Sequence, residues 1–125
     1  MEITDLRPTI VWKYFHEVTQ VPRPSKKEGK MIAFLESFAK EHHVAIKKDE
    51  VGNILMSKPA TPGMENRPVV VLQSHMDMVC EKNNGTQHDF DNDPIETIVD
   101  GEWLRANGTT LGADNGIGVA GLRNP

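Results

Sequence analysis

The apolar run Val69–Leu72, which stops at Gln73, is the feature that most constrains the fold of this chain. A short apolar run bounded by polar residues is typical of a strand buried on both faces of a parallel sheet. His75 and Asp77 follow it with i, i+2 spacing, and residues two apart in an extended chain project to the same side. We therefore expect both side chains at the C-terminal end of a buried strand, where open α/β sheets bind their ligands.

The residue types of this pair point to metal chemistry. Neutral imidazole is a good ligand for zinc and similar ions. A carboxylate such as Asp77 can accept the other ring N–H of His75, which fixes the tautomer and makes the imidazole more basic. The pair predicts half of a metal site, and the alternative for His75 is a hydrogen-bonded core histidine.

Asp114 is the candidate second ligand, at the start of a predicted helix and among Gly112, Ala113, Gly116 and Gly118. An aspartate in that place can cap the helix through its backbone N–H groups. A cap does not require so many small neighbours, however, whereas a backbone that passes close to an ion or to a second element does. Asp114 can serve as cap, as ligand, or as both.

The rest of the chain reads as helices and hairpins. Residues 8–20 form an amphipathic helix that the prolines of Val21-Pro-Arg-Pro24 end. Ser25 and Glu28 form a capping box that opens a second helix, ending near His42-His43. A hairpin or strand pair is expected over residues 44–56, and a second hairpin over 95–106 with Asp100-Gly101 as its turn.

Two further segments resemble ligand-binding motifs but lack features that those motifs require. Residues 116–121 match the dinucleotide pattern G-x-G-x-x-G, but no apolar strand precedes them and no acidic residue follows at the required distance. Asp89–Asp93 begins like a calcium loop, yet Pro94 stands where that loop needs glycine. We interpret it as an acidic surface loop, and the single Cys80 as a buried thiol without activating neighbours.

Composition bounds the function. A net charge of −4 gives no electrostatic footprint for nucleic acid. No apolar run is long enough for a membrane span, and the N-terminus lacks the pattern of a signal peptide. These features favour a cytoplasmic globular protein.

Two segments, His75-Met-Asp77 and Leu111-Gly-Ala-Asp-Asn-Gly-Ile-Gly118, carry a resemblance to a known family. In them the chain resembles the N-terminal part of the aminoacyl-histidine dipeptidases, which are di-zinc exopeptidases. The likeness runs from about Val11 to Ala120 and includes Val21-Pro-Arg-Pro-Ser-Lys-Lys-Glu28. The resemblance implies an α/β fold with a central mixed sheet flanked by helices, incomplete in this chain. It also implies that residues 1–125 are one segment of the catalytic domain, without the lid and dimerisation domain or the C-terminal half.

The resemblance further implies the roles of the site residues. His75 would bind one of two divalent metals, either zinc or alternatively manganese or cobalt, and Asp114 would bridge both. Asp77, the catalytic carboxylate of the segment, would hold His75. The implied reaction is hydrolysis of Xaa-His dipeptides by a homo-oligomer, in which a downstream glutamate is the general base.

The glutamate pair and the remaining ligands of that family are missing from this chain, so we expect it to be inactive alone. Two alternatives stay open. One is a non-enzymatic protein that binds a metal or a partner. The other is a tripeptidase or aminoacylase of the same superfamily.

Overall fold

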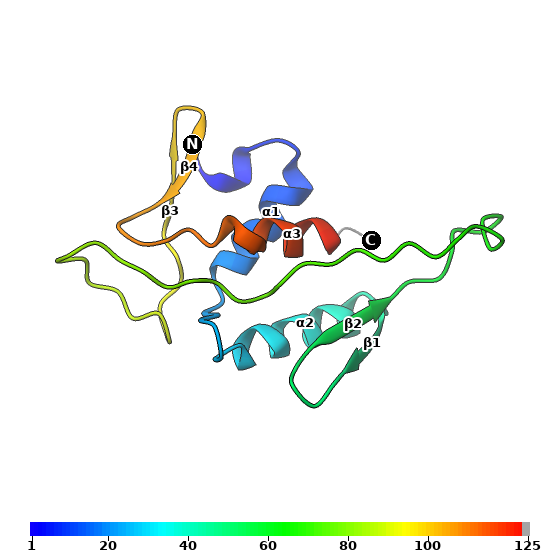
Figure 1. The fold of residues 1–125 in the computed structure, drawn as a ribbon. Helices are drawn as coiled ribbons and strands as arrows, with labels where there is room; N and C mark the ends of the chain where they lie inside the picture. The colour runs from blue at the N-terminus through cyan, green and yellow to red at the C-terminus, as the bar shows by residue number, and fades with distance from the viewer. Residues whose placement is uncertain (124–125) are drawn as a thin grey trace. The chain divides into compact units, whose positions relative to one another are not determined.

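The computed structural model describes residues 1–123, which separate into two compact units, residues 1–31 with 73–123 and residues 32–72. Asn124 and Pro125 lie outside the described residues. The elements follow the order η1 (Ile3–Asp5), α1 (Thr9–Thr19), α2 (Gly29–Glu41), β1 (Ala45–Lys48), β2 (Ile54–Ser57), β3 (Thr97–Asp100), β4 (Trp103–Ala106) and α3 (Ala113–Leu122) (Figure 1). No helix of residues 1–123 has the length and hydropathy needed to cross a membrane.

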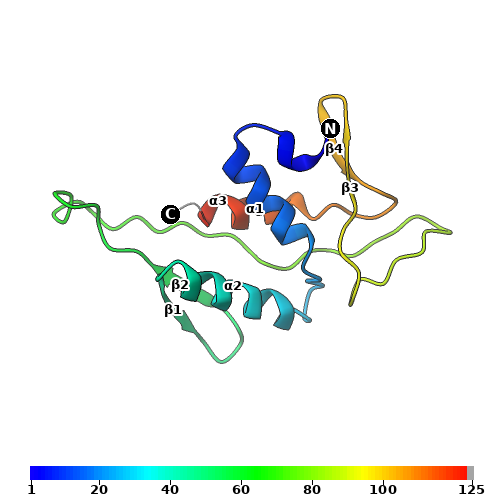
Figure 2. The same ribbon diagram turned by 180° about the vertical axis from the view of Figure 1, so that it is seen from behind.

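The core of the first unit is a helix pair. Helices α1 and α3 lie side by side, as views from opposite sides show (Figures 1 and 2). Phe15 and Val18 of α1 are buried at 1% and 0% exposure, and a Cβ at Gly116 of α3 would come within 3.0 and 3.3 Å of their side chains. Arg123 joins the same helices through an ion pair with Glu17 at 2.7 Å. The predicted apolar face of residues 8–20 is therefore confirmed.

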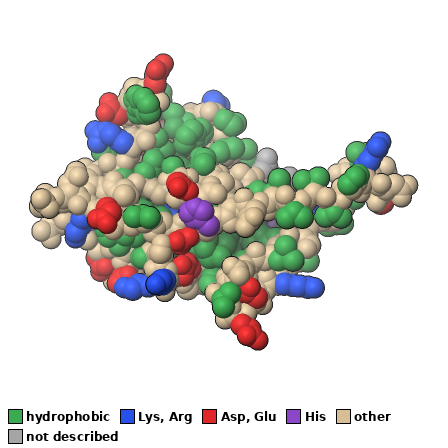
Figure 3. All heavy atoms as spheres, in the orientation of Figure 1, with side chains coloured by type: hydrophobic (Ala, Val, Ile, Leu, Met, Phe, Trp, Pro, Cys, Tyr) green, Lys and Arg blue, Asp and Glu red, His purple; other side chains and the backbone are tan. Residues whose placement is uncertain are grey.

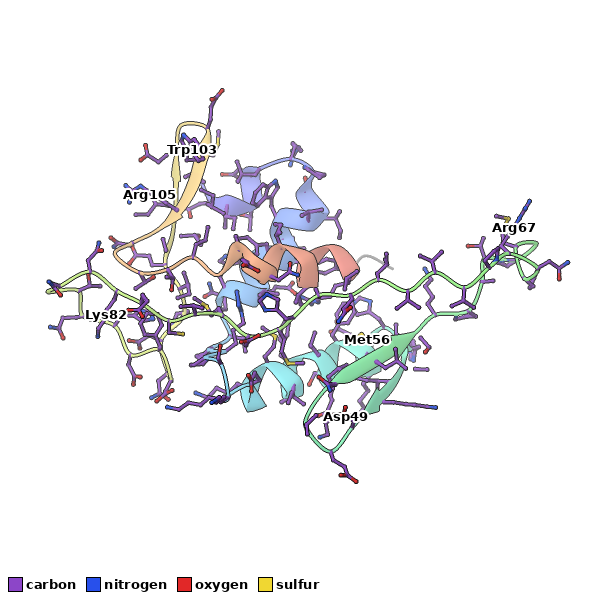
Figure 4. All side chains as sticks on the ribbon, viewed as in Figure 1. Asp49, Met56, Arg67, Lys82, Trp103 and Arg105 are labelled. Atoms are coloured by element: carbon purple, nitrogen blue, oxygen red, sulfur yellow. The ribbon has the colours of Figure 1, made fainter. Side chains whose placement is uncertain are left out.

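Both predicted hairpins are confirmed. Strands β1 and β2 pair antiparallel in the second unit, and β3 and β4 pair antiparallel in the first. In the second hairpin Asp100 pairs with Trp103, so Gly101 and Glu102 form the turn, one residue later than expected. Figure 4 shows Trp103 and Arg105 on this hairpin, and Asp49 in the turn that joins β1 to β2.

The predicted opening of the second helix at Ser25 is wrong. Helix α2 begins at Gly29, and the Glu28 carboxylate accepts the backbone N–H of Lys26 at 2.6 Å rather than completing a capping box with Ser25. Lys26 has a positive φ of 69°, which turns the chain before the helix begins. The Ser25 hydroxyl is therefore free to bond elsewhere.

The predicted buried strand at Val69–Leu72 is also wrong. The segment is extended but has no strand partner among residues 1–123, and its four side chains are 69–88% exposed. Figure 3 shows hydrophobic side chains along the extended segment that Figure 1 draws in green. The described strands form two separate two-stranded sheets, so the expected central mixed sheet is not assembled. A strand is buried in a sheet only when neighbouring strands pair with its edges, and residues 1–123 contain no strand that pairs with Val69–Leu72.

Candidate functional site

His75 and Asp77 meet as the i, i+2 spacing predicts. The Nδ1 atom of His75 lies 3.0 Å from Oδ1 of Asp77 and 3.2 Å from its backbone carbonyl. Both side chains project from the extended segment that follows Leu72. The local geometry therefore does not depend on the missing sheet, because extended backbone alone places the two side chains on one side.

Asp114 comes to the other ring nitrogen of His75. Its Oδ1 atom lies 2.9 Å from Nε2, although the two residues are 39 positions apart. Gly112 brings the chain round with a left-handed conformation, φ 76° and ψ 24°. Asp114 and Asn115 have non-helical backbone angles, so regular helix begins only after them. The Asp114 side chain is 95% exposed and points out of the turn.

The cap of α3 is Asn115 rather than Asp114. The Asn115 Oδ1 atom accepts the backbone N–H of Gly118 at 3.1 Å, whereas no backbone N–H within residues 1–123 donates to the Asp114 carboxylate. Of the two roles left open by the sequence, capping therefore belongs to the neighbouring residue. The Asp114 carboxylate remains available for another partner.

Arg23 and Ser25, in the segment Val21–Ser25, belong to the site, although the sequence did not predict this role for either. The Ser25 hydroxyl donates to Oδ2 of Asp77 at 2.5 Å. The Arg23 guanidinium is only 1% exposed and donates from Nη2 to the Gly112 carbonyl at 2.8 Å. The sequence pattern indicated only that Arg23 lies among the prolines that end a helix and that Ser25 opens the next helix as its cap.

The electrostatics of the site follow from these contacts. The Asp114 carboxylate at Nε2, helped by Asp77 at Nδ1, raises the pKa of His75 above its ordinary value, because both carboxylates stabilise the doubly protonated ring. The Ser25 hydroxyl, followed by His75, lowers the pKa of Asp77. Burial lowers the pKa of Arg23 to about 10, so the guanidinium remains charged at neutral pH. A carboxylate that stays ionised is a strong acceptor for the ring N–H of His75.

The donor set fits a metal centre in part. A neutral imidazole has one N–H and one lone pair, so it cannot donate to both carboxylates at once. If Nδ1–H donates to Asp77, the Nε2 lone pair faces the Asp114 carboxylate. Two ligands of the same cation face each other in this way. The observed separation of 2.9 Å is that of an ordinary hydrogen bond and is shorter than the roughly 3.3 Å between two tetrahedral zinc ligands. Within residues 1–123 no group of three or more His, Cys, Asp or Glu side chains is arranged to hold a metal.

The other polar groups singled out in the sequence take up local roles. Asp89 accepts the Asp91 backbone N–H at 2.9 Å and the Asn92 amide at 2.7 Å, so the acidic loop is closed by its own hydrogen bonds. Cys80 is half-buried rather than buried as predicted, and the partial burial raises the pKa of its thiol. A raised pKa leaves less thiolate, which agrees with the interpretation of Cys80 as an unactivated thiol.

Comparison with known proteins relates the chain to peptidases. It is 52% identical over 119 residues to the cytosol non-specific dipeptidase of Escherichia coli (strain K12), which is 95% of this chain and 24% of that protein. The crystal structure of aminoacylhistidine dipeptidase from Vibrio alginolyticus matches with a TM-score of 0.94 and 48% identity, over 98% of this chain and 25% of that one. No protein-family model matches.

A tripeptidase structure from Staphylococcus aureus matches with a TM-score of 0.72 over 91% of this chain and 30% of that one, but at 22% identity it shows the fold alone. The chain thus spans about a quarter of the length of the dipeptidases that it matches. These likenesses confirm the resemblance and the mixed helix and strand fold expected from the sequence. The metal roles of His75 and Asp114 and the catalytic role of Asp77 remain predictions.

Proposed function

We propose that this chain, as a segment of the dipeptidase family that it matches, supplies part of the metal centre of a metal-dependent dipeptidase. The observation that carries the proposal is the meeting of His75 Nε2 with the Asp114 carboxylate at 2.9 Å while Asp77 occupies Nδ1. Bound divalent metal ions, zinc or alternatively manganese or cobalt, polarise a scissile carbonyl and lower the pKa of a water. The residues of this chain would hold the metal ions and orient the side chains that bind them.

Each residue has a distinct task in this proposal. His75 would offer the Nε2 lone pair to a metal ion, and Asp114 would offer its carboxylate as a ligand shared between the ions. Asp77 keeps the proton on Nδ1, which raises the basicity of the ring as a ligand. The general base and the other ligands come from the three quarters of the related proteins that this chain does not span. The proposed substrates are dipeptides, Xaa-His dipeptides among them, and we propose a cytoplasmic homo-oligomer as the active form.

The decisive experiment exchanges these 125 residues for the matching segment of the Vibrio alginolyticus enzyme. The chimera is expected to hydrolyse β-alanyl-histidine with added Zn²⁺, Mn²⁺ or Co²⁺, because the segment is 48% identical. Asp114→Asn, which keeps the shape of the side chain but removes its charge, should lower kcat/KM at least about 100-fold. Asp100→Asn, in an exposed hairpin, is the matched control. Full activity of the Asp114→Asn chimera would contradict the proposal.

The chain by itself is expected to be inactive because it supplies two ligands and no general base. Metal-dependent hydrolysis by the purified 125 residues would disprove that expectation. A panel of dipeptides and tripeptides, assayed on the chimera, separates the dipeptidase proposal from the tripeptidase and aminoacylase alternatives. Binding of metal without any turnover by the chimera would favour the non-enzymatic alternative.

A further inference from the structure

Three consecutive residues, Arg23–Ser25, contact the segment that carries His75 and Asp77. The Arg23 carbonyl accepts the Met78 backbone N–H at 3.0 Å, and Pro24 forms a parallel β-bridge with Met78. From this anchored position the Ser25 hydroxyl donates to Asp77 Oδ2, the carboxylate oxygen that His75 does not contact. The two oxygens of Asp77 therefore have two different hydrogen-bond partners.

The same segment contacts the turn that carries Asp114. The Gly112 carbonyl, two residues before Asp114, accepts both Arg23 Nη2 at 2.8 Å and the Gly116 backbone N–H at 3.0 Å. A Cβ at Gly112 or Gly116 would lie only 2.6 or 2.7 Å from Nη2, so both positions leave room for the guanidinium. The small residues around Asp114 thus allow the backbone to pass close to the Arg23 side chain.

We propose that Ser25 and Arg23 are positioning residues that hold the two halves of the site in register. This inference rests on the proposed function, because it concerns the geometry of the same metal centre. Ser25 fixes the rotamer of Asp77, which keeps the ring proton on Nδ1 and the Nε2 lone pair aimed at Asp114. Arg23 fixes the Gly112 carbonyl, from which the chain reaches Asp114.

The surroundings of Arg23 argue against a role in stability alone. Within residues 1–123 its Nε and Nη1 atoms are buried without a hydrogen-bond partner. A buried charge that makes a single hydrogen bond gains little net stability, since its desolvation opposes the bond. What this arginine does provide is a strong, directional bond to one carbonyl beside the site.

The Ser25 half is tested by imidazole ¹⁵N chemical shifts of His75 in the metal-free 125-residue chain, at a pH at which the ring is neutral. Wild type and Ser25→Thr, which keeps the hydroxyl, should hold the proton on Nδ1. Ser25→Ala should move the population toward Nε2–H, and Ser57→Ala, at an exposed serine of β2, is the matched control. An unchanged tautomer in Ser25→Ala would overturn the role proposed for Ser25. A Ser25→Thr chain that behaves as Ser25→Ala does would overturn it too.

The Arg23 half is tested by amide hydrogen exchange. Arg23→Met should speed exchange of the Gly116 amide about tenfold or more, as the loss of one charge-assisted bond implies. Arg23→Lys should restore slow exchange by keeping a charged donor, and Arg67→Met, in an exposed loop, is the control. An unchanged Gly116 rate in Arg23→Met would overturn the assignment. Equal acceleration at Val18 in the core would do so too, because it would show general loosening.

Zn²⁺ titrated against the His75 ring signals separates the two proposals. Ser25→Ala and Arg23→Met should weaken binding by up to about 10-fold, because each acts on a metal ligand through one intervening group, whereas the loss of a direct outer contact to a ligand costs about 10–100-fold. Binding at wild-type strength in both variants would overturn positioning. If neither the wild-type ring nor the activity of the chimera responds to zinc, the proposed function fails, while the metal-free measurements still decide the roles of Ser25 and Arg23.

Discussion

The Asn115 side chain accepts the Gly118 backbone N–H at 3.1 Å and so caps α3 in place of Asp114. The turn thereby divides two tasks between adjacent residues. Asn115 satisfies an N–H group that the start of a helix leaves open. Asp114, one position earlier, keeps its carboxylate exposed toward His75.

This division predicts opposite sensitivities at the two positions. Asn115→Ala should lower the free energy of unfolding by about 1 kcal/mol, the usual cost of losing a cap. Asp114→Ala should change it by less than about 0.5 kcal/mol, because that side chain is exposed and caps nothing. Urea unfolding followed by circular dichroism measures both. A larger loss in Asp114→Ala than in Asn115→Ala would show that the cap is assigned to the wrong residue.

Gly118 is expected to be coupled to the same cap. A Cβ at Gly118 would lie 2.1 Å from Asn115 Oδ1, whereas one at Gly121 would meet nothing within 4 Å. Gly121→Ala should therefore stabilise the chain by up to about 1 kcal/mol, as alanine does in a helix. Gly118→Ala should lack this gain, because it displaces the Asn115 side chain.

A double-mutant cycle isolates this coupling. In an Asn115→Ala background the obstacle is gone, so Gly118→Ala should become stabilising like Gly121→Ala. Strictly additive effects of Asn115→Ala and Gly118→Ala on the urea midpoint would contradict the contact.

The turn between β1 and β2 should make stability depend on pH. The amide side chain and then the backbone N–H of Asn53 hold the pKa of Asp49 below its ordinary value. A carboxyl with a lowered pKa in the folded state contributes stability that is complete above its unfolded pKa of about 3.9. That contribution is lost as the pH falls through the folded pKa. The stability difference between wild type and Asp49→Asn should therefore shrink from pH 7 toward pH 3.

Urea midpoints at pH 7, 5, 4 and 3 measure this difference. Glu50→Gln removes an equal charge from the same turn without touching these hydrogen bonds, and is the control. A constant difference between wild type and Asp49→Asn over the whole range would mean that the Asn53 contacts are absent in solution.

The exposed run Val69–Leu72 should make the chain self-associate. An extended apolar segment without a strand partner is a template for pairing with another chain. Val70→Lys and Leu72→Lys, two substitutions on the same side of the run, should reduce association, because an edge charge opposes strand pairing. Sedimentation velocity at rising concentration measures it, with Lys substituted for the exposed Val51 of the β1–β2 turn as control. A wild-type chain that stays monomeric throughout would contradict this prediction.

The sequence alone determined the local elements and half of the site. The helix around Phe15 and Val18 and both hairpins follow from spacing and turn residues, which act over a few positions. The approach of His75 to Asp77 follows from extended geometry in the same way. Asp114 was found because its glycine neighbours required an explanation beyond a helix cap.

Tertiary structure decided what depends on distant partners. The burial of Val69–Leu72 depends on neighbouring strands, which residues 1–123 do not supply, so a correct apolar pattern gave a wrong prediction. Ser25 looked like a cap because its local pattern suits one, yet its hydroxyl bonds Asp77, 52 positions away. The role of Arg23 depends on its Gly112 contact, 89 positions away. Spacing rules describe neighbours in the chain, and only the folded backbone brings such residues within hydrogen-bond reach.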